Sequence, residues 1–345
     1  MQIEDRLNIE YPLIQAPMAG VQNWELAVAV SEAGGLGSIP CGMLNPDQVE
    51  QELNYFKQHS NKPYNLNFFC HTMPPVDEQK EARWLHHLST YYAEVGLAVS
   101  APPSALRMPF NDEMADRIEP FKPPVISFHF GLPARHLVER VKSWGTIILS
   151  SATTLEEATW LEAHGVDVLI AQGIEAGGHR GMFSDTQLDA QLPTKRLVKA
   201  IAAALSTPVI AAGGIASKQD IQDALNWGAA GVQLGTAFLL CNEANTSAAY
   251  RSALRDQKAE THLTNVFSGR PARGIENRLM KELGFISDKA PDFPYAATAV
   301  APLRAYSEQN QLGDFLPMWS GTNRSGCHEG PAAELVHSLS DEPLS

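Results

Sequence analysis

Short apolar runs alternate with amphipathic segments along most of the chain. The runs are continuously apolar, which is typical of strands in a parallel sheet that helices cover on both faces. The segments between them carry helix signals such as Asn45-Pro46, where a cap residue precedes a proline at the first helical position. Eight strands are predicted, at residues 13–16, 36–39, 64–69, 125–130, 146–149, 166–170, 209–212 and 231–234. This alternation favours an α/β fold, a TIM (β/α)8 barrel with its active site at the carboxyl ends of the strands.

A doubly wound dinucleotide-binding domain is the competing architecture. Such a domain would place a G-x-G-x-x-G turn directly after its first strand. The nearest match, Gly34-Gly35-Leu36-Gly37, follows a helix instead and lacks the third glycine. The pattern therefore favours the barrel.

The predicted strands also suggest how the chain is divided. We expect the barrel at residues 1–240, with residues 302–345 available to complete it. A smaller helical addition near the barrel mouth is expected at residues 241–301. Residues 70–124 form a long insertion between the third and fourth strands, with a helix predicted at 77–92. This insertion is either a lid or a structural element.

Composition narrows the class of protein. The chain has 345 residues and 44% hydrophobic content, which is enough to bury a large core. A net charge of -13 without any basic run argues against a nucleic acid or an anionic membrane as partner. The four cysteines form no C-x-x-C pair, so neither a zinc site nor a disulfide framework is indicated. With no apolar leader and no membrane-length run, we expect a cytoplasmic protein without a metal. Its oligomeric state stays open.

The candidate chemistry centres on residues 171–181, a glycine-dense loop after the sixth predicted strand. Glycines let the backbone turn sharply and approach a flat or phosphorylated ligand closely. His179 lies in this loop, and an unperturbed imidazole titrates at about pH 6.5, so it is a candidate proton acceptor. The alternative is a flexible turn whose histidine caps a helix. Ordinary loops seldom concentrate so many glycines beside a possible base, which favours the functional interpretation.

Two further glycine loops follow the seventh and eighth predicted strands, where barrel enzymes often hold phosphate. They begin with Gly213-Gly214 and Gly235-Thr236, which can present backbone N–H groups to an anion. A helix that starts near Ser217 would add its positive end. The alternative is that these glycines only make tight strand-to-helix turns. Their joint placement favours the phosphate site.

Six motifs are spread over these strand ends and the segments after them. They are QAPMAG at 15–20, SFHFG at 127–131, EAGGHRG at 175–181, AAGGI at 211–215, GVQLGT at 231–236 and SGRPARG at 268–274. Together they resemble the motifs of nitronate monooxygenases, formerly called 2-nitropropane dioxygenases. The resemblance runs from about Leu13 to about Trp319. The resemblance is weaker after Trp319-Ser320-Gly321, because the next residue is Thr322 and the family motif leads us to expect a glutamine there.

The resemblance implies a non-covalently bound FMN held at the strand ends. Carried over residue by residue, its contacts fall on Ala16, Pro17, Met18, Asn67, Gln172, Gly177, Gly214, Gln233, Leu234, Gly235 and Thr236. The residue types agree with this assignment. The amides of Asn67 and Gln172 suit the pyrimidine edge of a flavin, whereas the glycine loops suit its phosphate.

The same resemblance assigns roles to the charged and titratable side chains. His179 matches the catalytic base of the family. His129 either orients an anionic nitro group or is a structural histidine, and Arg180 is expected to face solvent. The arginines of the addition, Arg270, Arg273 and Arg278, are expected to be ion-paired rather than catalytic.

The implied activity is the oxidation of alkyl nitronates, such as propionate 3-nitronate, by dioxygen to a carbonyl compound and nitrite. A neutral nitroalkane would first have to lose its α-proton to His179. Two alternatives keep the barrel and FMN: an enoyl-acyl-carrier-protein reductase and an NAD(P)H:quinone reductase, which both need a reduced nicotinamide. A third alternative, from a different class, is a catalytically silent barrel that binds a phosphorylated ligand as a sensor.

Overall fold

Eight parallel strands form a barrel, in the order β1-β9-β8-β6-β5-β4-β3-β2. They are β1 (Leu13–Gln15), β2 (Gly37–Pro40), β3 (Tyr64–Phe69), β4 (Val125–His129), β5 (Ile147–Ala152), β6 (Val168–Gln172), β8 (Val209–Ala212) and β9 (Gly231–Leu234). A parallel bridge between Ile14 and Leu36 links β1 to β2. The Gln15 amide also donates to the Leu36 carbonyl oxygen at 2.9 Å. The predicted TIM barrel is confirmed.

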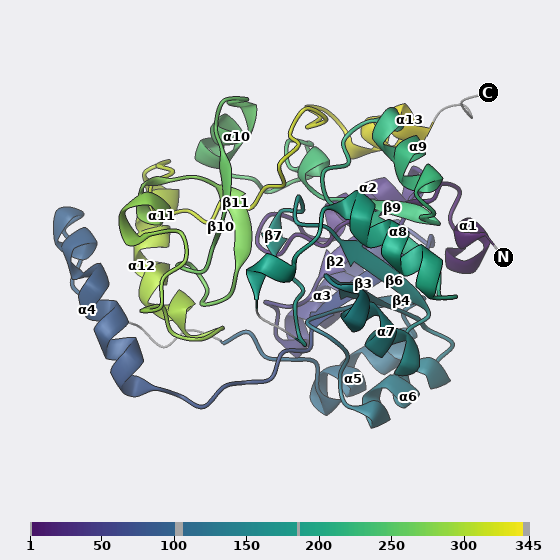
Figure 1. Ribbon diagram of the computed structural model, residues 1–345, viewed down its shortest axis with the longest axis horizontal. Helices are drawn as coiled ribbons and strands as arrows, with labels where there is room; N and C mark the ends of the chain where they lie inside the picture. The colour runs from purple at the N-terminus through teal and green to yellow at the C-terminus, as the bar shows by residue number, and fades with distance from the viewer. Residues whose placement is uncertain (1, 101–105, 185–186, 341–345) are drawn as a thin grey trace.

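The computed structural model describes residues 2–100, 106–184 and 187–340. Its α-helices are α1 (Ile3–Leu7), α2 (Trp24–Glu32), α3 (Pro46–His59), α4 (Glu78–Glu94), α5 (Asp112–Ile118), α6 (Arg135–Ser143), α7 (Leu155–Ala163), α8 (Thr194–Ala204), α9 (Lys218–Asn226), α10 (Ala248–Arg255), α11 (Arg278–Leu283), α12 (Ala296–Gln309) and α13 (Ala332–Ser340). Short 3-10 turns are η1 (Glu119–Phe121), η2 (Leu188–Ala190) and η3 (Thr236–Phe238). Figure 1 shows the barrel with its surrounding helices and, beside it, a smaller part that contains α4 and α10 to α12.

Local signals account for where these elements begin and end. At α3 the Asn45 side chain accepts from the Gln48 amide at 2.9 Å, and the Gln48 side chain accepts from the Asn45 amide at 3.0 Å. This reciprocal cap confirms the predicted helix start. All eight predicted strands are present, and β5 and β6 extend beyond the predicted ends to Ala152 and Gln172. The longer β6 brings the Gln172 side chain to the barrel mouth.

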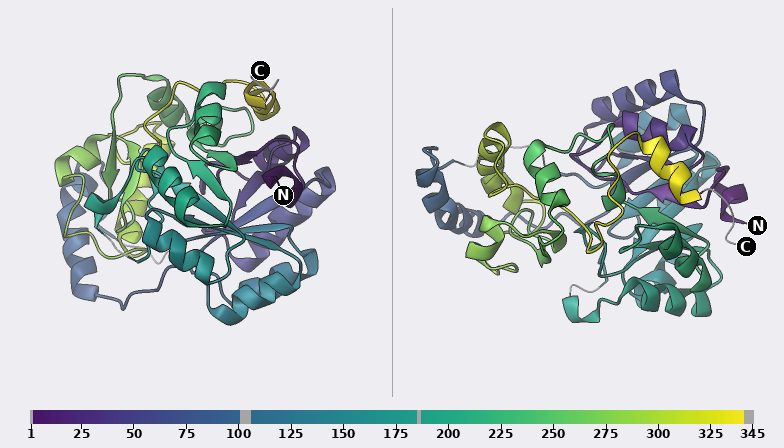
Figure 2. Two further views of the ribbon diagram at one scale, coloured as in Figure 1. Left: turned by 45° about the vertical axis from the view of Figure 1, so that its right-hand side comes forward. Right: turned by 90° about the horizontal axis from the view of Figure 1, so that it is seen from above.

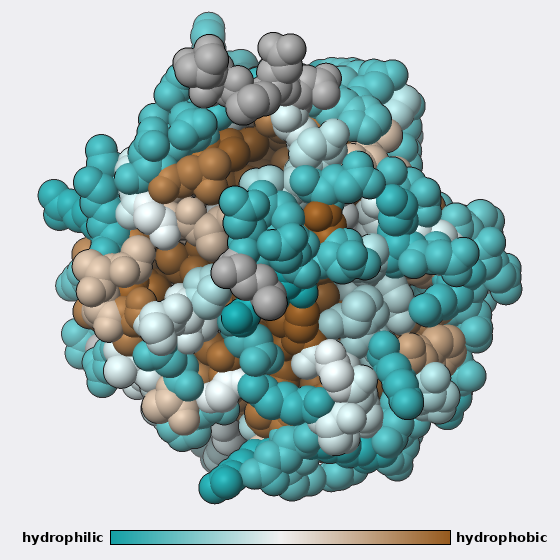
Figure 3. Space-filling view, turned by 90° about the vertical axis from the view of Figure 1, so that its right-hand side faces the viewer, coloured by the Kyte–Doolittle hydropathy of each residue, from teal (hydrophilic) through white to brown (hydrophobic). Residues whose placement is uncertain are grey.

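Apolar side chains close one end of the barrel. Ile3 and Leu7 of α1 pack with inward-facing strand residues such as Val168 and Ile210. The Arg6 guanidinium anchors α1 by donating to the carbonyl oxygen of Asp167, just before β6, at 2.8 Å. The face of the molecule near the chain termini is covered mostly by hydrophilic side chains, with smaller apolar patches among them (Figure 3). Because apolar side chains fill this end, the barrel is open to a ligand at the opposite end, where the strands finish.

A second apolar cluster holds the addition together. Trp84 and Tyr92 of α4 pack with Val266, Leu303 and Phe315. The Trp84 indole and the Tyr92 hydroxyl also donate to backbone carbonyl oxygens at the start of α12. Figure 2 shows α4 beside the addition and away from the barrel. The helix that we predicted in the insertion is present, and it serves as a structural element of the addition.

The addition also contains an antiparallel sheet that we did not predict. β10 (Thr261–Thr264) pairs with β11 (Ala272–Ile275), and β11 pairs with β7 (Gly178–His179) from the loop after β6. The addition is therefore joined to the barrel mouth by backbone hydrogen bonds. The residue boundaries that we proposed between barrel and addition stay predictions.

Among the described helices, none has both the length and the apolar character that a membrane span requires. The described residues contain no group of three or more His, Cys, Asp or Glu side chains placed to hold a metal ion.

Candidate active site

A cavity of about 550 Å³ opens at the carboxyl ends of the barrel strands. Every residue that we predicted to contact the cofactor or the substrate lines it: Ala16, Pro17, Met18, Asn67, His129, Gln172, Gly177, His179, Gly214, Gln233, Leu234, Gly235 and Thr236. These residues come from six different strand ends. The structure brings them together around one space, while their individual roles stay predictions.

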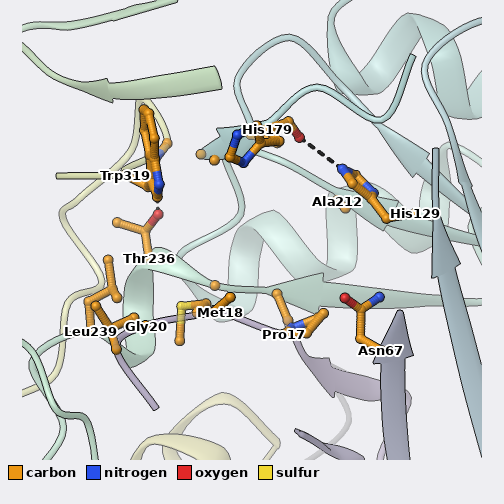
Figure 4. Close-up of a pocket in the computed structure, with 18 of the residues that line it drawn as sticks. Pro17, Met18, Gly20, Asn67, His129, His179, Ala212, Thr236, Leu239 and Trp319 are labelled. Carbon is orange, nitrogen blue, oxygen red and sulfur yellow. Dashed lines mark hydrogen bonds between the residues drawn. The ribbon is translucent and has the colours of Figure 1, made fainter. Parts of the chain in front are cut away.

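The cavity has two facing walls. Figure 4 shows His179 and Trp319 on one side, and Pro17, Met18 and Asn67 on the other. The ring centroids of His179 and Trp319 lie 5.4 Å apart. The space between these walls suits a flat ring system, because each wall presents apolar or aromatic surface together with a few polar atoms.

The loop that carries His179, residues 171–181, is called the histidine loop below. It is held by the addition and by close packing against His129. His179 is paired with Ala272 of β11, and the Arg180 amide donates to the Pro271 carbonyl oxygen at 2.8 Å. At Gly181 an added Cβ would lie 2.9 Å from a ring carbon of His129, closer than real Cβ atoms approach. The glycine there allows the loop to lie against His129.

Arg180 is buried, which corrects the expectation that it faces solvent. Its guanidinium donates to the carbonyl oxygens of Gly173 and Gln172, each at 2.7 Å, and to the side-chain oxygen of Gln191 at 2.8 Å. Burial, followed by the charge of Arg273, lowers the pKa of Arg180 to about 9. Because it binds these three acceptors, Arg180 fixes the conformation of the loop at residues 171–181.

His179 is neutral at ordinary pH and can accept a proton. Its Nε2 lies 2.8 Å from the Ser268 hydroxyl, and the rings of Phe293 and Trp319 flank it. Burial, followed by the positive charge of Arg107, holds the pKa of His179 well below its usual value. A neutral imidazole at the wall of a cavity is the state that a general base needs.

His129 is held by hydrogen bonds at both ring nitrogens. Nε2 lies 3.1 Å from the His179 carbonyl oxygen, which can only accept, so Nε2 carries the proton. Nδ1 then accepts from the Ser151 hydroxyl at 2.6 Å. Burial, opposed by the bond to the His179 carbonyl, lowers the pKa of His129 to about 3. This arrangement is that of a histidine that positions the His179 loop, and its proposed substrate contact stays a prediction.

The side-chain amides at the cavity differ in how many of their hydrogen-bonding groups already have partners within the protein. Gln172 donates to the His179 carbonyl oxygen at 2.9 Å and accepts from the Gly181 amide at 2.8 Å, so it braces the loop. Asn67 donates to Ser127 at 2.9 Å. The side-chain oxygen of Gln233 is buried and has no partner among the described residues. An orphaned acceptor on the cavity wall fits a ligand N–H group.

The expected phosphate end consists of backbone and small side chains. Gly214 has a φ of +74° and Thr236 accepts from the Gly321 amide at 3.0 Å, which leaves the Thr236 hydroxyl proton free to donate. At the start of α9, whose positive end we expected to add to this site, two backbone amides already have acceptors. Asp220 accepts from the Ala216 amide at 2.9 Å, and Ser217 caps the Asp220 amide. The two glycine loops are therefore the phosphate candidates.

The arginines of the addition are only partly as expected. Arg278 is ion-paired with Glu94 and Glu282. Arg273 instead donates to the Ile174 carbonyl oxygen at 2.9 Å, and Arg270 donates to the Met182 carbonyl oxygen. These two contacts join the addition to the histidine loop, so they replace the predicted ion pairs.

Some lining residues were not predicted from the sequence. Ser127 and Trp319 lie in or next to segments that carry family motifs, where a role could have been sought. Ser151 and Arg107 also line the cavity, and neither belongs to a motif. Arg107 lies in the insertion before β4, where no periodicity or spacing marks it.

The barrel, the cavity at its strand ends and the neutral histidine on the cavity wall define a barrel enzyme. The model of the family "Nitronate monooxygenase" matches residues 2–342. The chain belongs to the nitronate monooxygenase family, a family of flavin-dependent oxidoreductases.

Named relatives and solved structures support the same placement. The chain is 40% identical to a nitronate monooxygenase of Pseudomonas aeruginosa, over 97% of each chain. It is 33% identical to a probable nitronate monooxygenase of Bacillus subtilis, over 98% of each. A crystal structure of nitroalkane oxidase from Streptomyces ansochromogenes matches with a TM-score of 0.90 and 35% identity, over 98% of this chain and 96% of that one. FabK from Thermotoga maritima, at 24% identity and a TM-score of 0.73, over 98% of this chain and 94% of that one, shares the fold.

Proposed function

We propose that the protein binds FMN and uses it to oxidise alkyl nitronates with dioxygen, releasing a carbonyl compound and nitrite. Propionate 3-nitronate is the substrate we would test first, and neutral nitroalkanes extend the range. The observation that carries the proposal is the convergence of every carried-over family position on one cavity beside a neutral His179. Family membership supports the same chemistry.

Different residues of the cavity would bind the phosphate and the ring of FMN. The Gly214 and Gly235 loops, with the Thr236 hydroxyl, would hold the phosphate through backbone and hydroxyl donors. Asn67 and the orphaned oxygen of Gln233 would face the polar edge of the ring. When bound, FMN supplies the redox chemistry, accepting the electrons that the nitronate gives up.

His179 acts on substrates that still carry their α-proton. The Ser268 hydroxyl also lies 3.3 Å from the Arg270 carbonyl oxygen, so it can donate there and accept from Nε2 of His179. Nδ1 of His179 is then the atom that accepts the α-proton. A nitronate has already lost that proton and needs only to be positioned. The neighbouring Phe293 and Trp319 rings limit water around the imidazole.

An absorbance spectrum tests the proposal. We expect purified protein to show a flavin spectrum that bleaches when propionate 3-nitronate is added without oxygen, and to form nitrite when air is admitted. Rapid bleaching by NAD(P)H instead would identify one of the two nicotinamide-dependent reductases. Colourless protein that takes up no FMN would identify the sensor barrel.

We also propose that the protein works in the cytoplasm. Four free cysteines and a net charge of -13 support a reducing, cytoplasmic location and small-molecule substrates rather than nucleic acid.

A further inference from the structure

Arg107 forms no ion pair with any residue that the structure describes. It lines the main cavity and also a side cavity of about 160 Å³ that opens next to it. Its Nη1 atom is buried and has no hydrogen-bond partner among the described residues. Its guanidinium carbon lies 5.6 Å from the ring centroid of Phe293. Leaving a guanidinium nitrogen buried and unpaired is costly, and an anion bound to it would remove that cost.

The neighbouring arginines differ from Arg107 because the protein itself supplies their acceptors. Arg304 donates to Glu308 at 2.8 Å. Arg180 and Arg270 donate to backbone carbonyl oxygens. Burial, followed by the charge of Arg304, lowers the pKa of Arg107 to about 10, and no carboxylate of the described residues opposes this shift. Arg107 is therefore still cationic at neutral pH.

The histidines around this arginine do not provide positive charge. Burial lowers the pKa of His129 to about 3 and that of His71 to about 4, and holds the pKa of His179 well below its usual value. All three rings are neutral at pH 7. A negatively charged substrate that enters between them finds its charge complement at Arg107.

The position of Arg107 in the barrel separates it from the expected phosphate site. Its segment is tied to β3, because the Phe110 amide donates to the Phe69 carbonyl oxygen at 2.8 Å. The phosphate loops follow β8 and β9. Around the closed barrel, β4, β5 and β6 separate β3 from β8 on one side, and β2 and β1 separate β3 from β9 on the other. The arginine is close enough to His179 for its charge to lower the pKa of that ring. Arg107 therefore belongs to the substrate end of the cavity.

We propose that Arg107 is the specificity-determining residue that binds an anionic group of the substrate, a planar pair of oxygens. This inference rests on the proposed oxidation of nitronates. A guanidinium matches such a pair with two parallel N–H donors. The two oxygens belong either to the nitronate group or to a carboxylate elsewhere on the substrate. Both groups are planar anions that present two oxygen acceptors. When His179 removes the α-proton of a neutral nitroalkane, Arg107 also stabilises the nitronate that forms.

Three variants of the flavin-loaded protein test this role. Arg107→Met removes the charge and keeps an apolar stem, and Arg107→Lys keeps the charge without the paired donors. Arg135→Met, on the exposed surface of α6, is the matched control. Calorimetry would measure the binding of nitrite and of neutral nitroethane to each. Steady-state kinetics would compare kcat/KM for ethyl nitronate and propionate 3-nitronate.

We expect Arg107→Met to weaken nitrite binding about 10- to 100-fold, as for the loss of a hydrogen bond to a charged group, and to leave nitroethane binding nearly unchanged. Arg107→Lys should recover part of the loss. A parallel loss of kcat/KM for both nitronates assigns Arg107 to the nitronate oxygens, and a loss for propionate 3-nitronate alone assigns it to the carboxylate.

Unchanged nitrite binding and unchanged kcat/KM in Arg107→Met would overturn the assignment. So would equal losses for nitrite and nitroethane, or a loss of FMN affinity in place of nitrite affinity, because the arginine would then serve structure or the cofactor. Failure of the proposed function is a separate result. The wild type would then bind FMN yet oxidise neither nitronate, while the nitrite measurements would still report on Arg107.

Discussion

The ring of His179 shares a hydrogen bond with the hydroxyl of Ser268, with Nε2 and Oγ 2.8 Å apart. The two residues are 89 positions apart in the chain. His179 belongs to the loop after β6, and Ser268 belongs to the addition between β10 and β11. The proposed base and the hydroxyl bonded to it therefore come from different parts of the protein. The pairing of β7 with β11 holds them in register.

Replacing the base should separate substrates by their protonation state. His179→Asn keeps a polar side chain but cannot accept a proton at neutral pH. We expect it to lose about 10²-fold or more of kcat/KM for a neutral nitroalkane, the low end of general-base contributions. It should keep FMN and much more of its nitronate turnover. The measurement compares both forms of one compound, with His136→Asn on the exposed start of α6 as control. Equal losses for the two forms would mean that His179 binds the anion instead.

The depressed pKa of His179 predicts an unusual pH profile. A general base works in its unprotonated form, which predominates above its pKa. Because burial and the charge of Arg107 hold this pKa well below 6.5, the base stays unprotonated as pH falls through 6.5. We expect kcat/KM for a neutral nitroalkane to stay level from pH 8 to below 6.5 and to fall only at lower pH. Half-loss of the rate at pH 6.5 or above would contradict this. In Arg107→Met the fall should move to higher pH.

A matched pair of glycine substitutions tests the phosphate loop. Gly214 and Gly284 have nearly equal φ angles, +74° and +77°, but only Gly214 lines the cavity. Alanine at either position places a side chain at a positive φ, which costs on the order of 1 to 3 kcal/mol. We therefore expect both variants to lose thermal stability. Only Gly214→Ala should weaken FMN binding, by about tenfold or more, because its Cβ hinders close approach of backbone amides to the phosphate.

Equilibrium dialysis of the two apoproteins against FMN would measure this difference. Equal FMN affinities in the two variants would show that the Gly214 loop does not hold the phosphate.

Arg180 should contribute to stability rather than to catalysis directly. Arg180→Met leaves the carbonyl oxygens of Gly173 and Gln172 without their donors in a buried place. We expect the free energy of unfolding to fall by about 3 kcal/mol, the upper range for single substitutions that orphan buried polar groups. Denaturant titration of the flavin-free protein would measure it, with Arg135→Met as the surface control. A change no larger than that of the control would show that this hydrogen-bond cluster is not stabilising.

The sequence by itself determined the eight barrel strands and the glycine loops at their ends. Strand periodicity and helix caps are local signals, because a buried parallel strand is apolar over its length and a cap acts within one helical turn. The Asn45 cap and the β3 span of Tyr64–Phe69 follow the local pattern residue by residue. His179 was found in the same way, since its loop concentrates glycines beside one titratable ring.

Only the tertiary structure decided which distant groups surround that ring. Arg180 is buried because two carbonyl oxygens and Gln191 converge on it, and nothing next to it in the chain indicates this. Ser268 and Arg107 reach His179 from segments about 70 to 90 residues away. Such contacts depend on how the addition packs against the barrel mouth, which is set by long-range burial rather than by local propensity. The chain pattern thus specified the barrel and the loop that carries His179, whereas long-range packing placed Arg107 and Ser268 beside that histidine.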